Sequence, residues 1–144
     1  MSLLRNPYFV VPAIAWGIAQ VSKVITDSVL TRRLNVRRLA TAGGMPSSHT
    51  ALVMALTTVI GRLQGLQAPL FALSLLFSLV VMYDATGVRR SAGQQAMILN
   101  RLLDDLFIAH QGIRQERLRE LLGHTPIEVF AGGALGVIVG LAFT

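Results

Sequence analysis

The chain of 144 residues is the length of one domain, and 53% of its residues are hydrophobic and 14% charged, against about 45–50% and about 25% in soluble domains. Its net charge of +6 comes mainly from arginines between apolar stretches, which favours charge flanking membrane segments over a nucleic-acid-binding face, so no nucleic-acid partner is expected. The absence of cysteine excludes disulfides, thiol catalysis and cysteine-based metal sites.

Four apolar stretches have, or nearly have, the length of about 20 residues that a helix needs to cross a hydrocarbon core. They run approximately from Tyr8 to Ile25, Ser48 to Leu66, Ala68 to Thr86 and Pro126 to Thr144. The N-terminal residues lack the order of a cleavable signal, so we expect the first stretch to be mature structure. Buried helices of a soluble all-α protein are the alternative. Four such stretches in a short chain favour an all-α integral membrane bundle, with four transmembrane helices in one domain over residues 1–144.

The segment Ser91–His110 is predicted to be a fifth, amphipathic helix on the cytoplasmic side. Its apolar residues recur at three- and four-residue steps and form one stripe: Ala92, Ala96, Leu99, Leu103 and Leu106. Such a helix lies on the membrane surface, caps the bundle, or packs on the helix ends.

Arginines set the expected orientation. The connection between the first two stretches contains Arg32, Arg33, Arg37 and Arg38, and the one between the last two contains Arg89, Arg90, Arg101, Arg114, Arg117 and Arg119. The middle connection offers only Arg62. The first and third connections should therefore face the cytoplasm.

Four polar clusters fall at helix ends on that same face. Lys23 and Asp27 end the first helix, and Gly43-Gly44-Met45-Pro46-Ser47-Ser48-His49 leads into the second. Asp84 and the pair Arg89-Arg90 close the third helix, and Gly123-His124-Thr125-Pro126-Ile127-Glu128 opens the fourth. This convergence predicts one site at the cytoplasmic face, with Asp84 among its substrate-binding candidates.

The clusters fit an anion site, and each also has a purely structural interpretation. Lys23 is either a pocket residue or a lysine that extends to the interface. Ser47 and Ser48, with the amides of the helix N-terminus, bind an anion or merely cap the helix. Arg89 and Arg90 either hold phosphate oxygens or anchor the helix at the membrane face.

His124 and Glu128 are one helical turn apart. A carboxylate in that position can hold one imidazole nitrogen and leave the other facing the site, as in a nucleophile or general-base pair. Surface pairs of this spacing are also common. Gly132, Gly136 and Gly140 continue the same line and predict close helix packing, within the chain or between chains.

These blocks resemble a known family. Pro46-Ser47-Ser48-His49 is similar to the Pro-Ser-Gly-His motif of the type-2 phosphatidic acid phosphatase and vanadium haloperoxidase superfamily. The segment from Gly123 to Gly132 resembles its closing motif, a histidine followed four residues later by aspartate. Together with VMYDATGVRRSAGQQAMILN, they look like the divergent, acid-phosphatase-related bacterial and plastid branch. This resemblance implies a bacterial inner membrane, or a thylakoid or other plastid membrane, with the site facing the cytoplasm or the stroma.

The resemblance implies a role for each matching residue. His124 would attack phosphorus and form a phosphohistidine, Glu128 would orient it, and His49 would protonate the leaving alcohol. Ser48 would stabilise the phosphoryl oxygens, and Lys23 matches the lysine of the first motif. The implied catalysis uses no metal or cofactor, because cationic side chains meet the developing charge.

Several positions depart from the superfamily pattern. Ser48 replaces glycine, Glu128 replaces aspartate, and the Arg-Pro pair of the first motif is missing at its usual spacing after Lys23. Leu118 stands where an arginine usually precedes the histidine, which suggests a motif split between Arg89-Arg90 and His124 by an insertion.

We therefore expect a metal-independent phosphatase whose substrate is a lipid-linked phosphate or pyrophosphate at the cytoplasmic membrane face. The alternative is a non-catalytic descendant that binds a lipid headgroup or serves as a small subunit of a larger membrane complex. Membrane lipid is an expected partner of both, and the glycine-lined helix also suits a homodimer or a larger assembly.

Overall fold

The computed structural model describes residues 3–31, 44–107 and 123–144, and every regular element in these ranges is a helix. A 3₁₀ turn, Leu3–Arg5, precedes five α-helices. They are α1 (Pro7–Thr31), α2 (Ser48–Gln64), α3 (Pro69–Thr86), α4 (Val88–Phe107) and α5 (Pro126–Ala142). The predicted all-α fold is confirmed, and each apolar stretch forms one helix.

Local signals explain where the helices begin and end. Pro69 and Pro126 occupy the first turns of α3 and α5, where a missing amide hydrogen costs no hydrogen bond. The side chain of Ser47 caps α2, and Gly65 ends it with a φ of 89°, a conformation that favours glycine.

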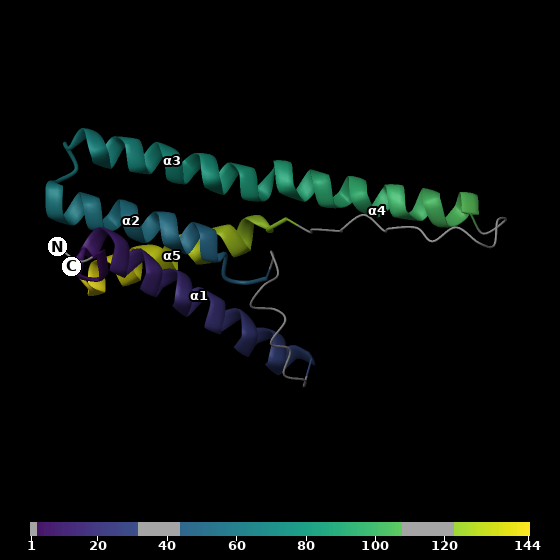
Figure 1. Ribbon diagram of the computed structural model, residues 1–144, viewed down its shortest axis with the longest axis horizontal. Helices are drawn as coiled ribbons and strands as arrows, with labels where there is room; N and C mark the ends of the chain where they lie inside the picture. Colours follow the sequence, from purple (N-terminus) through teal and green to yellow (C-terminus); the bar gives the residue numbers. More distant parts are fainter. Residues whose placement is uncertain (1–2, 32–43, 108–122) are drawn as a thin grey trace.

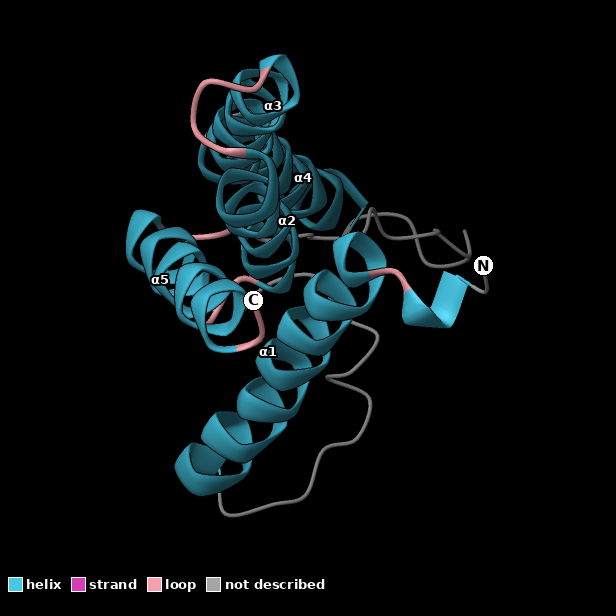
Figure 2. Ribbon diagram, turned by 90° about the vertical axis from the view of Figure 1, so that its left-hand side faces the viewer, coloured by secondary structure: helices cyan, strands magenta, loops and turns pink. Residues whose placement is uncertain are grey.

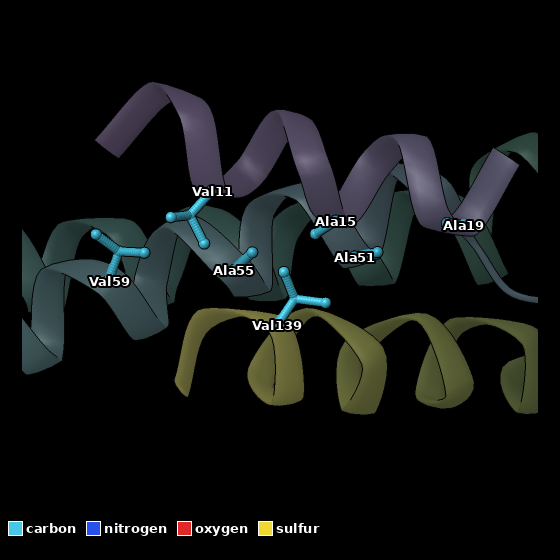
Figure 3. Packing of buried hydrophobic residues seen from close by; sticks show 7 residues of the cluster. All are labelled: Val11, Ala15, Ala19, Ala51, Ala55, Val59 and Val139. Atoms are coloured by element: carbon cyan, nitrogen blue, oxygen red, sulfur yellow. The ribbon is translucent and has the colours of Figure 1, made fainter. Parts of the chain in front are cut away.

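Helix α2 lies at the centre of the bundle and packs against α1, α3 and α5, while α1 also packs against α5 (Figures 1 and 2). The core between α1, α2 and α5 consists of small and β-branched side chains (Figure 3). Its buried members are Val11, Ala15, Ala19, Ala51, Ala55, Val59 and Val139. Side chains of this size let the helix backbones approach closely, as is common in membrane bundles.

The glycines of α5 supply the closest of these approaches. A Cβ atom added at Gly132 would collide with the carbonyl oxygen of Ser47, and one added at Gly136 would collide with that of Ala51. At Gly140 an added Cβ would lie 2.6 Å from Cβ of Thr58. The predicted small-residue face therefore packs within the chain, against α2.

Helix α4 differs from the expected arrangement. It continues α3 in nearly the same direction beyond the bundle (Figure 1), and among the described elements it contacts only α3. The reason lies at Gly87, whose amide still donates to the carbonyl of Tyr83 (2.9 Å) and whose carbonyl accepts from the amide of Ser91 (2.9 Å). The helical pattern thus passes through the glycine. Among the described residues this amphipathic helix contacts only the end of α3 and does not cap the bundle. Its placement on the membrane surface stays a prediction, and its predicted end at His110 lies outside the described residues.

Two described stretches are long and apolar enough to cross a membrane, Pro7–Val29 and Pro69–Leu103. Only 11% of the apolar window in the second is buried, whereas a core helix of a soluble protein would bury most of its surface. The exposed surface of α3 includes several large apolar side chains: Leu73, Leu76, Phe77, Leu79 and Val80. Helix α5 is apolar but shorter, with 17 residues. The count of four spans therefore stays a prediction.

Candidate functional site

The first turns of α2 and α5 lie side by side and join directly. The amide of Ser47 donates a hydrogen bond to the carbonyl of Glu128 at 2.9 Å, and the amide of His124 donates to the carbonyl of Ala85, near the end of α3, at 3.1 Å. These two bonds hold the start of α5 against both α2 and α3. The starts of α2 and α5 and the end of α3 therefore meet at one end of the bundle, and the gathering of all four polar clusters into one site stays a prediction.

Lys23 of α1 brings in the remaining cluster. Its side chain is 5% exposed, and its Nζ donates to Oγ of Ser48, which is 1% exposed, at 3.1 Å. The carboxylate of Glu128 lies close enough for its charge to act on the Lys23 ammonium. A buried ammonium is costly without a partner. Lys23 is therefore buried in the bundle beside Ser48, and its role as a ligand of a phosphate pocket stays a prediction.

Gly44 lies beside this lysine. Its φ of 87° lies in the left-handed region, and an added Cβ would already be in contact with Cγ of Lys23, at 3.8 Å. A larger residue would be strained there by its backbone conformation. The backbone conformation, rather than a lack of space beside Lys23, therefore favours glycine at this position.

Ser47 is used within the protein. Its Oγ accepts from the Thr50 amide (3.4 Å) and from the Thr50 hydroxyl (3.0 Å), while its own amide is bonded to Glu128. Both polar groups of Ser47 therefore serve the helix cap and the contact with α5. Of the two interpretations weighed for Ser47, capping accounts for these contacts, whereas Ser48 faces Lys23.

His124 and Glu128 form the predicted pair. Nδ1 of His124 lies 3.0 Å from Oε2 of Glu128, and the imidazole is 4% exposed while Glu128 is half-buried. An ionised carboxylate only accepts hydrogen bonds, so a neutral imidazole in this contact carries its proton on Nδ1 and its lone pair on Nε2. An imidazole held in this way is suited to nucleophilic attack or to general-base catalysis.

The other predicted site residues are placed more loosely. His49 follows Ser48 on α2 and is exposed, and Arg90 is exposed on α4. Asp84 is half-buried on α3, next to the Ala85 carbonyl that receives the His124 amide. The side chain of Arg89 lies outside the described part of the structure. The described residues contain no group of three His, Cys, Asp or Glu side chains able to hold a metal ion, and metal-free catalysis stays a prediction.

The sequence analysis missed Thr125. Its Oγ1 accepts from the Glu128 amide (3.4 Å), and its own amide donates to Oε2 of Glu128 (3.1 Å). The two bonds form a capping box at the start of α5. The signal was available, because a threonine followed three residues later by glutamate ahead of an apolar run is its usual pattern.

Comparison with known proteins gives two matches. A sequence model described as the divergent PAP2 family matches residues 4–139. A protein of Bacillus subtilis (strain 168) with the name "Uncharacterized membrane protein YuiD" is 42% identical, over 98% of this chain and 96% of its own length. No solved structure matches. The resemblance found from the motifs is therefore confirmed, and with the relative's name the apolar helices indicate a membrane protein.

Proposed function

Because this chain belongs to the divergent PAP2 family, we propose that it is a phosphatase that cleaves a lipid-linked phosphate monoester or pyrophosphate at the membrane surface. The observation that carries the proposal is the placement of two polar pairs at one end of the bundle. His124 is held by Glu128, and Lys23 is held by Ser48. The bond between the Ser47 amide and the Glu128 carbonyl joins them.

The proposed reaction has two displacements at phosphorus. Nε2 of His124 attacks, its new bond to phosphorus forms, and the bond from phosphorus to the alcohol oxygen of the lipid breaks. The departing oxygen takes a proton from His49. Water then attacks phosphorus and gives a proton to His49, the bond from phosphorus to Nε2 breaks, and inorganic phosphate leaves with both histidines restored.

Lys23 is the proposed partner of the phosphoryl oxygens. An ammonium in a protein interior stabilises transferring negative charge strongly, because little water screens it. Ser48 adds a hydroxyl, and the exposed guanidinium of Arg90 suits the outer side of the site. Arg89 and Asp84 stay candidates for the same role.

The exposure of His49 fits a proton donor that meets the leaving group from the water side. Successive residues on a helix point about 100° apart, so Ser48 faces the bundle while its neighbour does not. In this proposal the phosphoryl group enters between α1 and α5, and the lipid oxygen lies toward α2.

We place the site on the cytoplasmic or stromal face of four membrane-crossing helices. The arginine-rich first and third connections support this orientation. The outward apolar surface of α3 suits contact with lipid tails, so a substrate can keep its tail in the bilayer while its headgroup reaches the helix ends.

One observation favours a second function, the binding of a lipid headgroup or a subunit role without turnover. The ammonium of Lys23 is already bonded to the Ser48 hydroxyl, at a position where the superfamily motif has glycine. A phosphate group must share Lys23 with that hydroxyl. Both functions predict affinity for phosphate, and only the first predicts catalysis.

Measuring the release of inorganic phosphate distinguishes the phosphatase from the non-catalytic binding protein. Protein purified in detergent micelles, and again in liposomes, is assayed with phosphatidic acid, a polyprenyl pyrophosphate and an aryl phosphate. Release that is lost in His124→Ala supports the phosphatase. Binding of vanadate without release from any of these esters would support the binding protein instead.

A further inference from the structure

One carboxylate oxygen has two partners at the start of α5. Oε2 of Glu128 accepts from the Thr125 amide at 3.1 Å and lies 3.0 Å from Nδ1 of His124. The Thr125 hydroxyl in turn accepts from the Glu128 amide at 3.4 Å. The helix cap and the histidine pair are therefore one hydrogen-bonded unit that shares a single oxygen.

We propose that Thr125 is a positioning residue: its capping box fixes the Glu128 side chain so that His124 keeps its proton on Nδ1 and presents Nε2 to the substrate. Glutamate has three side-chain torsions and reaches many positions when it is unrestrained. The capping box turns the Glu128 side chain back toward the start of the helix and selects the position in which Oε2 contacts both the Thr125 amide and Nδ1 of His124. The catalytic meaning of this control rests on the proposed function, whereas the control of the tautomer does not.

The geometry also gives a reason for glutamate in place of the usual aspartate. Glu128 is the third residue of α5, and its carboxylate must reach back to the amide of the cap residue while it also meets His124. Aspartate is one methylene shorter, so it has less reach for both tasks. Thr125 and the length of Glu128 should therefore matter together.

Simple stabilisation of the helix end is the competing interpretation, because any capping box gives it. That role changes the melting temperature of the protein and leaves the chemistry of His124 unchanged. Control of the tautomer changes the chemistry as well. The two interpretations are separated by measuring both quantities in the same variants.

The experiment is nitrogen-15 NMR of histidine-labelled protein in micelles, at a pH where the imidazoles are neutral. The chain has three histidines, and the signal of His124 is the one missing from His124→Ala. The parent should show the proton on Nδ1. Thr125→Val keeps the backbone amide and the shape but loses the hydroxyl acceptor, and it should shift His124 toward the form with the proton on Nε2.

Kinetics are measured on the same variants. Thr125→Val should lower kcat about tenfold, because the imidazole is less often correctly oriented, and should change KM less than about twofold. Thr125→Ser restores the hydroxyl and should restore both the tautomer and kcat. Glu128→Asp should resemble Thr125→Val. Thr58→Val is the control, because the same substitution there removes a hydroxyl that donates within α2, to the Met54 carbonyl.

A parent protein with the His124 proton on Nε2 overturns the proposal. So does a Thr125→Val protein that melts at a lower temperature but keeps the parent tautomer, since this is the behaviour of a cap alone. If Thr125→Val does not fold, Thr125→Ala, which removes the same hydroxyl, and Glu128→Asp decide between the two interpretations by the same spectra. If the parent lacks phosphatase activity, the proposed function fails, and the tautomer measurements still test the positioning role.

Discussion

At the scale of single residues, the site depends on charges that are removed from water. Within the described structure, the Lys23 ammonium donates a hydrogen bond to the Ser48 hydroxyl, and it interacts electrostatically with the Glu128 carboxylate. Ser48 and Glu128 lie in the first turns of α2 and α5. Ser47 serves the fold, while its neighbour Ser48 faces the lysine. Neighbours in the sequence thus have different tasks because a helix turns them to different sides.

The lysine gives the first prediction. Lys23→Met keeps an unbranched apolar chain, one atom shorter than lysine, but removes the charge, and it should weaken binding of vanadate or inorganic phosphate about tenfold or more. A hydrogen bond to a charged group contributes roughly 1.5–3 kcal/mol. Isothermal titration of the purified protein measures the change. Gln64→Ala is the control, since this exposed residue bonds to Tyr8 at the opposite end of the bundle. Equal affinity in Lys23→Met and the parent would show that the lysine is no ligand.

At the scale of elements, the contact between α2 and α5 sets the geometry of the site. The glycines of α5 bring its backbone against α2, and the bond from the Ser47 amide to the Glu128 carbonyl follows from that approach. His124 sits one turn before Glu128, so its position depends on this packing. Helix packing and chemistry are therefore coupled along one face of α5.

Substitution of these glycines tests the coupling. Gly136→Ala places a Cβ against the carbonyl of Ala51 and 2.9 Å from Cβ of Met54, so the helices must separate. The protein should lose about 1–3 kcal/mol of stability, as overpacked cores do. Thermal unfolding in detergent measures the loss. Gly17→Ala on α1 is the control, because nothing lies within 4 Å of the added atom, and it should be neutral or slightly stabilising. Equal melting of the two variants would contradict the packing described here.

Much of this arrangement follows from the sequence, for identifiable reasons. The apolar stretches and the positions of Pro69 and Pro126 predict the helices, and the arginine-rich connections group the polar clusters. The direction of α4 was not predictable in this way, because Gly87 is a helix breaker in isolation but keeps both backbone hydrogen bonds here. Inward Ser48 and outward His49 depend on the rotation of α2, which the packing against α1 and α5 decides.

At the scale of the whole molecule, membrane orientation is the next quantity to determine. Arginines concentrate in two of the three connections between the four apolar stretches, so these two arginine-rich connections should lie on one side of the membrane. The chain has no cysteine, which makes single substitutions informative. Arg37→Cys, in a connection outside the described residues, and Gln64→Cys should react with an impermeant thiol reagent from opposite sides. Labelling of both from the same side would contradict the topology and the shared face of the site.

The proposed mechanism depends on the formation of a phosphohistidine at His124. The most direct measurement uses substrate labelled with phosphorus-32. The reaction is stopped within the first turnover, and the protein is separated from substrate under alkaline conditions, which preserve phosphohistidine. The parent should retain label that acid releases, Glu128→Gln should retain less because its neutral amide holds the imidazole more weakly, and His124→Ala should retain none. Labelled His124→Ala, or a parent that turns over substrate without ever holding label, would contradict the mechanism.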